Sequence, residues 1–171
     1  MPEPIHGKLK RSLDAAEGLY HRLVLLVGEA GSGKTGVLQK VAEEFGTSVV
    51  NVNLALSSEM LDMTTKQRSL RLPGILDQIV AKLRAPVVLD NLEILFDKDL
   101  KQDPLRLLQG LSRNQTVLAS WNGTLNGVRL LYAETGHPEY RSYDAVDALI
   151  VGMDGAATVV SAKNNREAGQ A

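Results

Sequence analysis

The feature that most constrains this chain of 171 residues is a glycine-rich turn that follows an apolar run and precedes an amphipathic segment. Leu23–Val27 is continuously apolar, which is typical of a strand buried on both faces. Apolar side chains then recur with helical spacing from Val37 to Phe45. The turn between them matches the pattern G-x-x-x-x-G-K-[ST] and consists of Gly28, Glu29, Ala30, Gly31, Ser32, Gly33, Lys34 and Thr35.

The residue types in this turn suit a nucleoside triphosphate. Glycines permit positive φ, so that backbone N–H groups surround phosphate oxygens, and the following helix directs its positive end at the same oxygens. We expect all eight residues to bind the nucleotide, with Lys34 on the β- and γ-phosphates and the Thr35 hydroxyl on Mg²⁺. The expected cofactors are ATP and Mg²⁺: the absence of an NKxD-like guanine-reading motif favours ATP, although the sequence leaves the choice between ATP and GTP open.

The rest of the chain alternates between strand-like and helix-like segments. This alternation predicts an α/β P-loop NTPase fold with a mostly parallel sheet flanked by helices. Further helices are expected from Pro73, from Asp103-Pro104 and over 138–147. Further strands are expected at Ser48–Val52, Val87–Asp90, Thr116–Ser120, Val128–Tyr132 and Ala148–Met153. Only the seven residues 121–127 separate the fourth strand from the fifth, too few for a parallel crossover, so these two should form a hairpin.

Length and composition predict one domain. Residues 23–153 should form the P-loop NTPase domain, 1–22 a leading helix at its edge, and 154–171 a small, polar and mobile tail. No room remains after Met153 for a C-terminal helical lid domain. The net charge is −1 and cysteine is absent, which excludes a general basic coat, a disulfide scaffold and thiol chemistry. With no membrane-length apolar run and no signal peptide, a cytoplasmic protein without membrane contact is expected.

A second carboxylate should complete the metal site. Asp90 closes the third strand and is expected to hold Mg²⁺ together with Thr35. One strand separates the phosphate loop from Asp90, which is similar to the additional-strand division of P-loop ATPases that includes the AAA+ and RecA-like groups. In that division a catalytic glutamate usually follows the aspartate directly, whereas Asn91 follows it here. Glu93 and Glu29 are the candidate catalytic bases, and either could equally be a solvated surface carboxylate.

Three further polar residues are candidates for catalysis. Asn122 ends the fourth strand, where the same division carries a residue that contacts the γ-phosphate and the attacking water, although Asn-Gly is also a common turn pair. Arg141 lies where AAA+ proteins place an arginine that acts on a neighbouring subunit, and Arg113 is its rival. Either arginine could instead be merely solvated. An arginine supplied in this way implies a homo-oligomer.

Several phrases of the sequence resemble a particular family, the BrxF family of small P-loop proteins from type 3 BREX bacteriophage-exclusion systems. The resemblance implies a bacterial cytoplasmic antiviral component that works with other BREX subunits, with DNA contact only through the complex. It extends from about Leu23 to Asp144 and rests on VGEAGSGKT, VVLDNLEILFD, KQDPLRLLQGLSRN, ASWNG and AETGHPEYRSYD.

Three functions are therefore open. The first is an oligomeric ATPase or ATP-dependent switch that is slow or activated by a partner. The alternative is a small P-loop kinase that transfers the γ-phosphoryl group to a small acceptor, with Lys66, Arg68 and Arg71 in a basic lid. The third is a nucleic-acid-binding module that uses ATP structurally, but basic clusters such as Lys8–Arg11 lack interleaved aromatic residues.

Overall fold

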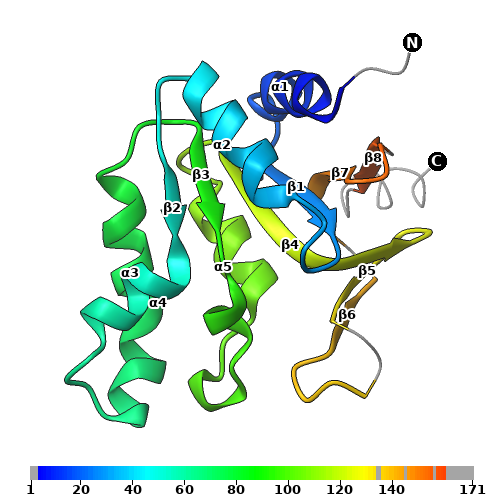
Figure 1. Ribbon diagram of the computed structural model, residues 1–171. Coiled ribbons are helices and arrows are strands. Elements are labelled where there is room, and N and C mark those ends of the chain that lie inside the picture. Colours follow the sequence, from blue (N-terminus) through cyan, green and yellow to red (C-terminus); the bar gives the residue numbers. More distant parts are fainter. Residues whose placement is uncertain (1–3, 134–135, 145, 156, 161–171) are drawn as a thin grey trace.

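The computed structural model describes residues 4–133, 136–144, 146–155 and 157–160 (Figure 1). The helices are α1 (Ile5–Ala16), α2 (Lys34–Glu44), α3 (Val52–Glu59), α4 (Thr65–Ala81) and α5 (Pro104–Leu111), with short 3-10 helices η1 (Glu93–Phe96) and η2 (Lys98–Leu100). The strands are β1 (Leu23–Gly28), β2 (Val49–Asn51), β3 (Val87–Asp90), β4 (Val117–Asn126), β5 (Arg129–Tyr132), β6 (Arg141–Tyr143), β7 (Ala148–Gly152) and β8 (Ala157–Val160).

A mostly parallel sheet forms the centre of the molecule, which confirms the predicted α/β class. Its strand order is β2-β3-β4-β1-β7-β8, and neighbouring strands are parallel except for the final pair β7 and β8. The fourth strand thus lies between the first and the third. In this order the carboxyl ends of β1, β3 and β4 lie side by side.

Helices cover both faces of the sheet, as the continuous apolar run of β1 predicts. Leu23, Leu25 and Val27 face a core built with α3, α4 and α5, while Val24 and Leu26 face a second core built with α1 and α2. The leading helix α1 is anchored by three buried residues, Leu9, Leu13 and Ala16. In the described part of the chain no helix follows α5, so no helical lid is evident there. None of the described helices is long and apolar enough to cross a membrane.

The predicted hairpin is confirmed. β4 is unusually long, and its outer residues Gly123–Asn126 leave the parallel sheet and pair with β5 in antiparallel register. Gly127 turns the chain with a φ of 64°. The hairpin projects beyond the rim of the parallel sheet (Figure 1).

The prediction that a helix begins at Pro73 is wrong, because α4 already begins at Thr65 and Pro73 lies inside it. A capping box starts the helix: the Thr64 hydroxyl accepts from the backbone N–H of Gln67, whose side chain accepts from that of Thr64. Proline cannot donate to the carbonyl of Ser69 four residues earlier. The side chain of Gln102 donates to that carbonyl instead, over 2.8 Å.

Two predictions near the carboxyl terminus also need correction. Residues 138–147 were expected to form a crossover helix, but Arg141–Tyr143 is a strand whose backbone pairs with β5. The segment 154–171 was expected to be mobile, yet Ala157–Val160 pairs with the edge of β7. The sequence of β8, ATVV, is rich in β-branched residues, which favours this pairing. Within that segment, residues 156 and 161–171 lie outside the described part of the chain.

Candidate functional site

Three adjacent parallel strands, β1, β4 and β3, bring the phosphate loop, Asp90 and Asn122 to one edge of the sheet. Gly28 at the end of β1 is in register with Asn122 of β4, and Asp90 ends β3 on the other side of β4. A cleft of about 370 Å³ opens at this edge, between the phosphate loop and the ends of β3 and β4. We call it the phosphate cleft; it is lined by Ala30, Gly31, Gly33, Lys34, Thr35, Asp90, Asn91, Glu93 and Asn122.

The phosphate loop depends on glycine at specific positions. Gly31 and Gly33 have φ values of 80° and 94°, which other residues adopt only with strain. A Cβ atom at Gly28 would lie 2.6 Å from the Ser32 Oγ and 2.7 Å from the Met153 Cγ. Met153 follows β7, and its backbone N–H donates to the carbonyl of Val27, so the end of β7 supports the loop from beneath. Sequence reasoning missed Met153 because only the pairing of β7 with β1 brings it there.

Lys34 is held inside this loop. Its Nζ donates to the carbonyl oxygens of Gly28 and Glu29, each at 2.8 Å, and only 6 % of the residue is exposed. Burial lowers the pKa of Lys34 below its usual value, while the carboxylates of Asp90 and Glu93 act in the opposite direction. A bound phosphate would offer the Lys34 ammonium charged oxygen acceptors in place of these two neutral carbonyl oxygens. Charged acceptors bind an ammonium group more strongly.

The two residues that are predicted to hold the metal, Asp90 and Thr35, contact each other directly. The Thr35 Oγ1 donates to the Asp90 Oδ2 at 2.7 Å, and the Ser120 Oγ donates to the Asp90 Oδ1 at 2.6 Å. Among the described residues no group of three or more His, Cys, Asp or Glu side chains could hold a metal ion. The donor set nevertheless fits Mg²⁺, which prefers oxygen ligands and usually takes only one or two of them from the protein. Ser120 was not among the predicted site residues. Its hydrogen bond fixes the carboxylate of Asp90, which was predicted.

Glu93 reaches the same cleft through an unusual turn. Asn91 has a φ of 56°, and this left-handed residue redirects the chain after β3. Two side-chain amides then hold the carboxylate: Asn122 donates to its Oε1 at 2.7 Å and Asn53 donates to its Oε2 at 2.8 Å. Asn53 also accepts from the backbone N–H of Ile94 at 2.7 Å. The only feature of the sequence that could have pointed to Asn53 is its position just after β2, the strand that neighbours β3.

The other candidates lie outside the phosphate cleft. The carboxylate of Glu29 belongs to a wider neighbouring cleft. Arg141 lies in β6 and donates from Nη2 to the carbonyl of Gln102 at 3.1 Å. Arg113 lies at the opposite, amino-terminal edge of the sheet, with its guanidinium 4.8 Å from the centroid of the Tyr20 ring.

The basic residues of the expected kinase lid line neither cleft. All three, Lys66, Arg68 and Arg71, lie on α4. Arg68 donates to the carbonyls of Leu61 and Met63, which fixes the turn before α4. Arg68 therefore supports the turn before α4, and none of the three side chains lines a cleft that could hold a phosphate.

The strand order, the phosphate loop and the aspartate at the end of β3 together define a P-loop NTPase of the additional-strand type. Residues 24–119, more than half of the chain, match the family described as "ATPase family associated with various cellular activities (AAA)", and the chain belongs to this family. No matching protein of curated function and no matching solved structure was found. Membership of the family indicates a nucleotide-binding, ATPase-like function.

Proposed function

We propose that this chain binds Mg·ATP in the phosphate cleft and hydrolyses it slowly until a second copy or a partner protein completes the site. The observation that carries the proposal is the convergence of Lys34, Asp90 and Glu93 on one cleft at the carboxyl ends of three adjacent strands. These groups supply a cation for the phosphates, a metal ligand and a candidate base. Residues Gly28–Thr35 bind the phosphates, and Thr35 and Asp90 hold Mg²⁺, which neutralises charge on the phosphate oxygens.

Glu93 is the proposed base that orients the attacking water. Both of its oxygens already accept hydrogen bonds from amides, which hold the carboxylate in place and compete with a water molecule for its lone pairs. Asn122 lines the same cleft, and we expect it to contact the γ-phosphate. The chain alone should therefore turn over slowly, and an event that separates Asn53 from Glu93 should accelerate it.

The charge that develops on the phosphate during hydrolysis needs a further cation. In the described part of the chain no arginine lines the phosphate cleft. We infer that Arg141, with Arg113 as the rival, acts on the site of a neighbouring copy, so that the working form is a homo-oligomer. An arginine supplied in this way typically accelerates phosphoryl transfer by about 10³-fold or more.

The proposed setting is bacterial antiviral defence in the cytoplasm, alongside other BREX subunits that bring the chain to DNA. The support is the sequence resemblance to the BrxF family in phrases outside the phosphate loop, such as VVLDNLEILFD at Val87–Asp97. Affinity purification of the full chain, with each neighbouring BREX protein co-expressed in turn, tests this setting. Failure to retain any of them would contradict it and would leave ATP binding unaffected.

The site assignment is tested by replacing the buried lysine. Lys34→Ala should weaken ATP binding about 100-fold, because the phosphate charge loses its partner inside a poorly solvated cleft. Lys40→Ala is the matched control, since Lys40 is exposed on the same helix α2 and should leave binding unchanged. Calorimetric titration with Mg·ATP measures both. Equal affinity in the Lys34→Ala variant would show that the phosphates bind elsewhere.

The shared-site proposal needs a separate experiment. Light scattering with and without Mg·ATP, combined with phosphate release from the same samples, should show assembly and a turnover per chain that rises with protein concentration. Arg141→Ala should lower turnover without weakening ATP binding. Mixing inactive Arg141→Ala chains with inactive Lys34→Ala chains should restore activity, because each supplies what the other lacks. No recovery at any mixing ratio, with Arg113→Ala tested in parallel, would refute the arginine supplied in trans.

A further inference from the structure

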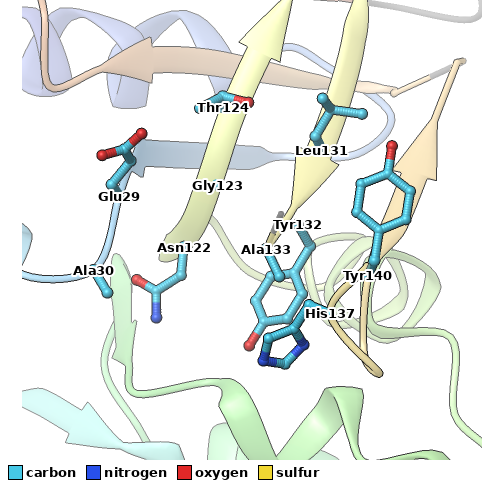
Figure 2. A pocket seen from close by; sticks show the side chains of 10 residues that line it. All are labelled: Glu29, Ala30, Asn122, Gly123, Thr124, Leu131, Tyr132, Ala133, His137 and Tyr140. Atoms are coloured by element: carbon cyan, nitrogen blue, oxygen red, sulfur yellow. The ribbon is translucent and has the colours of Figure 1, made fainter. Parts of the chain in front are cut away.

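A second and larger cleft lies beside the phosphate cleft, and no role has yet been assigned to it. Its volume is about 810 Å³, and it extends from the phosphate loop across the β4–β5 hairpin (Figure 2). We call it the hairpin cleft. It shares Ala30 and Asn122 with the phosphate cleft. Because Asn122 also binds Glu93, the shared wall is on the side where hydrolysis is proposed.

The charge in the hairpin cleft is one-sided. Glu29 lines it, whereas no lysine or arginine appears among its described lining residues. The nearby arginines are engaged elsewhere: Arg141 donates to the carbonyl of Gln102, and Arg129 pairs with Asp144 at 2.8 Å. A ligand with a negative charge would find no lysine or arginine among these residues, whereas a cation would find a carboxylate.

The potential at the inner end of the cleft is also negative. Tyr132 is buried there, and its pKa is raised above the usual value, first by burial and then by the charges of Glu93 and Glu139. Two separate carboxylates thus disfavour a further negative charge at this hydroxyl. The same two charges favour a ligand cation.

Aromatic side chains supply the other half of a cation site. Figure 2 shows Tyr132 and His137 at one end of the cleft, with Glu29 and Tyr140 on opposite sides of it. The Tyr132 ring is fixed by stacking on Phe96, with 4° between the two planes. Aromatic faces attract ammonium and guanidinium groups, and a carboxylate accepts hydrogen bonds from them. The volume is in the range of small-molecule sites.

We propose that the hairpin cleft binds a small organic cation, one that carries a guanidinium or primary ammonium group, between Glu29 and the ring of Tyr140. This proposal goes beyond ATP hydrolysis, because binding of the cation requires no turnover. A positive charge beside the phosphate cleft should also strengthen the binding of ATP, and ATP should strengthen binding of the cation by the same factor.

The test is calorimetric titration of the full chain with agmatine, which carries both a guanidinium and a primary ammonium group. We expect saturable binding with one site per chain. Glu29→Gln should weaken it at least about tenfold, because the neutral amide no longer offsets the ligand charge. Glu59→Gln is the matched control, since Glu59 is exposed at the end of α3 and should leave the affinity unchanged.

A second pair of variants tests the aromatic contact. Tyr140→Ala should weaken agmatine binding several-fold, while Tyr140→Phe keeps the aromatic face and should retain it. Lys34→Ala should weaken ATP binding about 100-fold and leave agmatine binding in place, so that failure of the ATP site and failure of the cation site can be distinguished. ATP should tighten agmatine binding in the unmodified chain.

Three outcomes would overturn the proposal. The first is heat that does not saturate, and the second is an agmatine affinity that both Glu29→Gln and Tyr140→Ala leave unchanged. The third is binding of a hexa-arginine peptide with no binding of agmatine, which would make the cleft a contact for a basic protein segment. Any of them could occur while ATP binding and hydrolysis remain as proposed.

Discussion

The two halves of β4 differ sharply in their surroundings. The inner half, Val117–Trp121, is completely buried, and Val117–Ala119 is paired with β1 on one side and β3 on the other. The outer half, Gly123–Asn126, pairs only with β5 and alternates between covered and exposed residues. One strand therefore belongs to both a rigid sheet and a projecting hairpin. Asn122, which holds Glu93, lies at the boundary between them.

The boundary itself is tightly built. Trp121 donates from Nε1 to the carbonyl of Leu131 at 3.0 Å, and the backbone N–H of Ala133 donates to the carbonyl of Asn122 at 3.1 Å. A Cβ atom at Gly123 would lie only 1.8 Å from the Leu131 oxygen. β5 thus approaches β4 so closely at position 123 that only glycine fits. The backbone hydrogen bond from Ala133 also ties the position of β5 to Asn122.

The largest expected effect comes from filling that contact. Gly123→Ala should lower the free energy of unfolding by roughly 2–4 kcal/mol, because backbone rather than a flexible side chain must move away. Gly110→Ala is the control: it lies in α5 with nothing within 4 Å of an added Cβ and should be neutral or slightly stabilising. Urea denaturation measures both. Equal stability of the two variants would mean that the boundary between the halves is loose.

The next effect compares the two amides that hold Glu93. Asn122→Ala should lower the rate of phosphate release about 100-fold, because a positioned donor near the γ-phosphate is lost. Asn53→Ala should instead raise the rate about threefold, since it releases one oxygen of the proposed base. Single-turnover measurements on saturated protein separate these rates from binding. A similar fall in both variants would show that the two amides only support the fold.

The smallest effect is the dependence of ATP affinity on pH. It arises in the phosphate cleft, beside the buried inner half of β4, and depends on Lys34. The lowered pKa of Lys34 means that the nucleotide-free chain loses this proton below the usual value of 10.5. The neutral amine cannot offset phosphate charge, so ATP affinity should fall as the pH rises from neutral into the alkaline range, and the fall should begin below the pH at which an ordinary lysine titrates. Proton uptake on binding, measured by calorimetry in buffers of different ionisation enthalpy, checks the sign. Lys34→Arg should remove the dependence, because arginine stays charged throughout.

Local sequence was sufficient to predict the phosphate loop, the strands β1 and β3 beside it, and the hairpin. The phosphate loop has a full motif, β1 and β3 are continuous apolar runs, and Asp90 marks the end of one of them. The short connection after β4 excluded a parallel crossover and so predicted the hairpin. Each of these signals lies within a few residues of the feature that it predicts.

The features that were missed depend on contacts between distant segments. α4 runs through Pro73 because Gln102, 33 residues after Ser69, satisfies the carbonyl that proline leaves without a donor. Asn53 and Met153 join the site only because β2 and β7 place them there. β6 forms because β5 offers it an edge, which no local pattern around Arg141 reveals.

The close approach at Gly123 also has an evolutionary consequence. The residues beyond this point, up to the exposed Val128 at the tip of the hairpin, make no contribution to the phosphate cleft. Substitutions and insertions there leave the nucleotide chemistry intact, whereas a substitution at Gly123 is penalised at once. The hairpin beyond Gly123 can therefore change without loss of the phosphate cleft, whereas position 123 itself cannot accept a side chain unless β5 moves away.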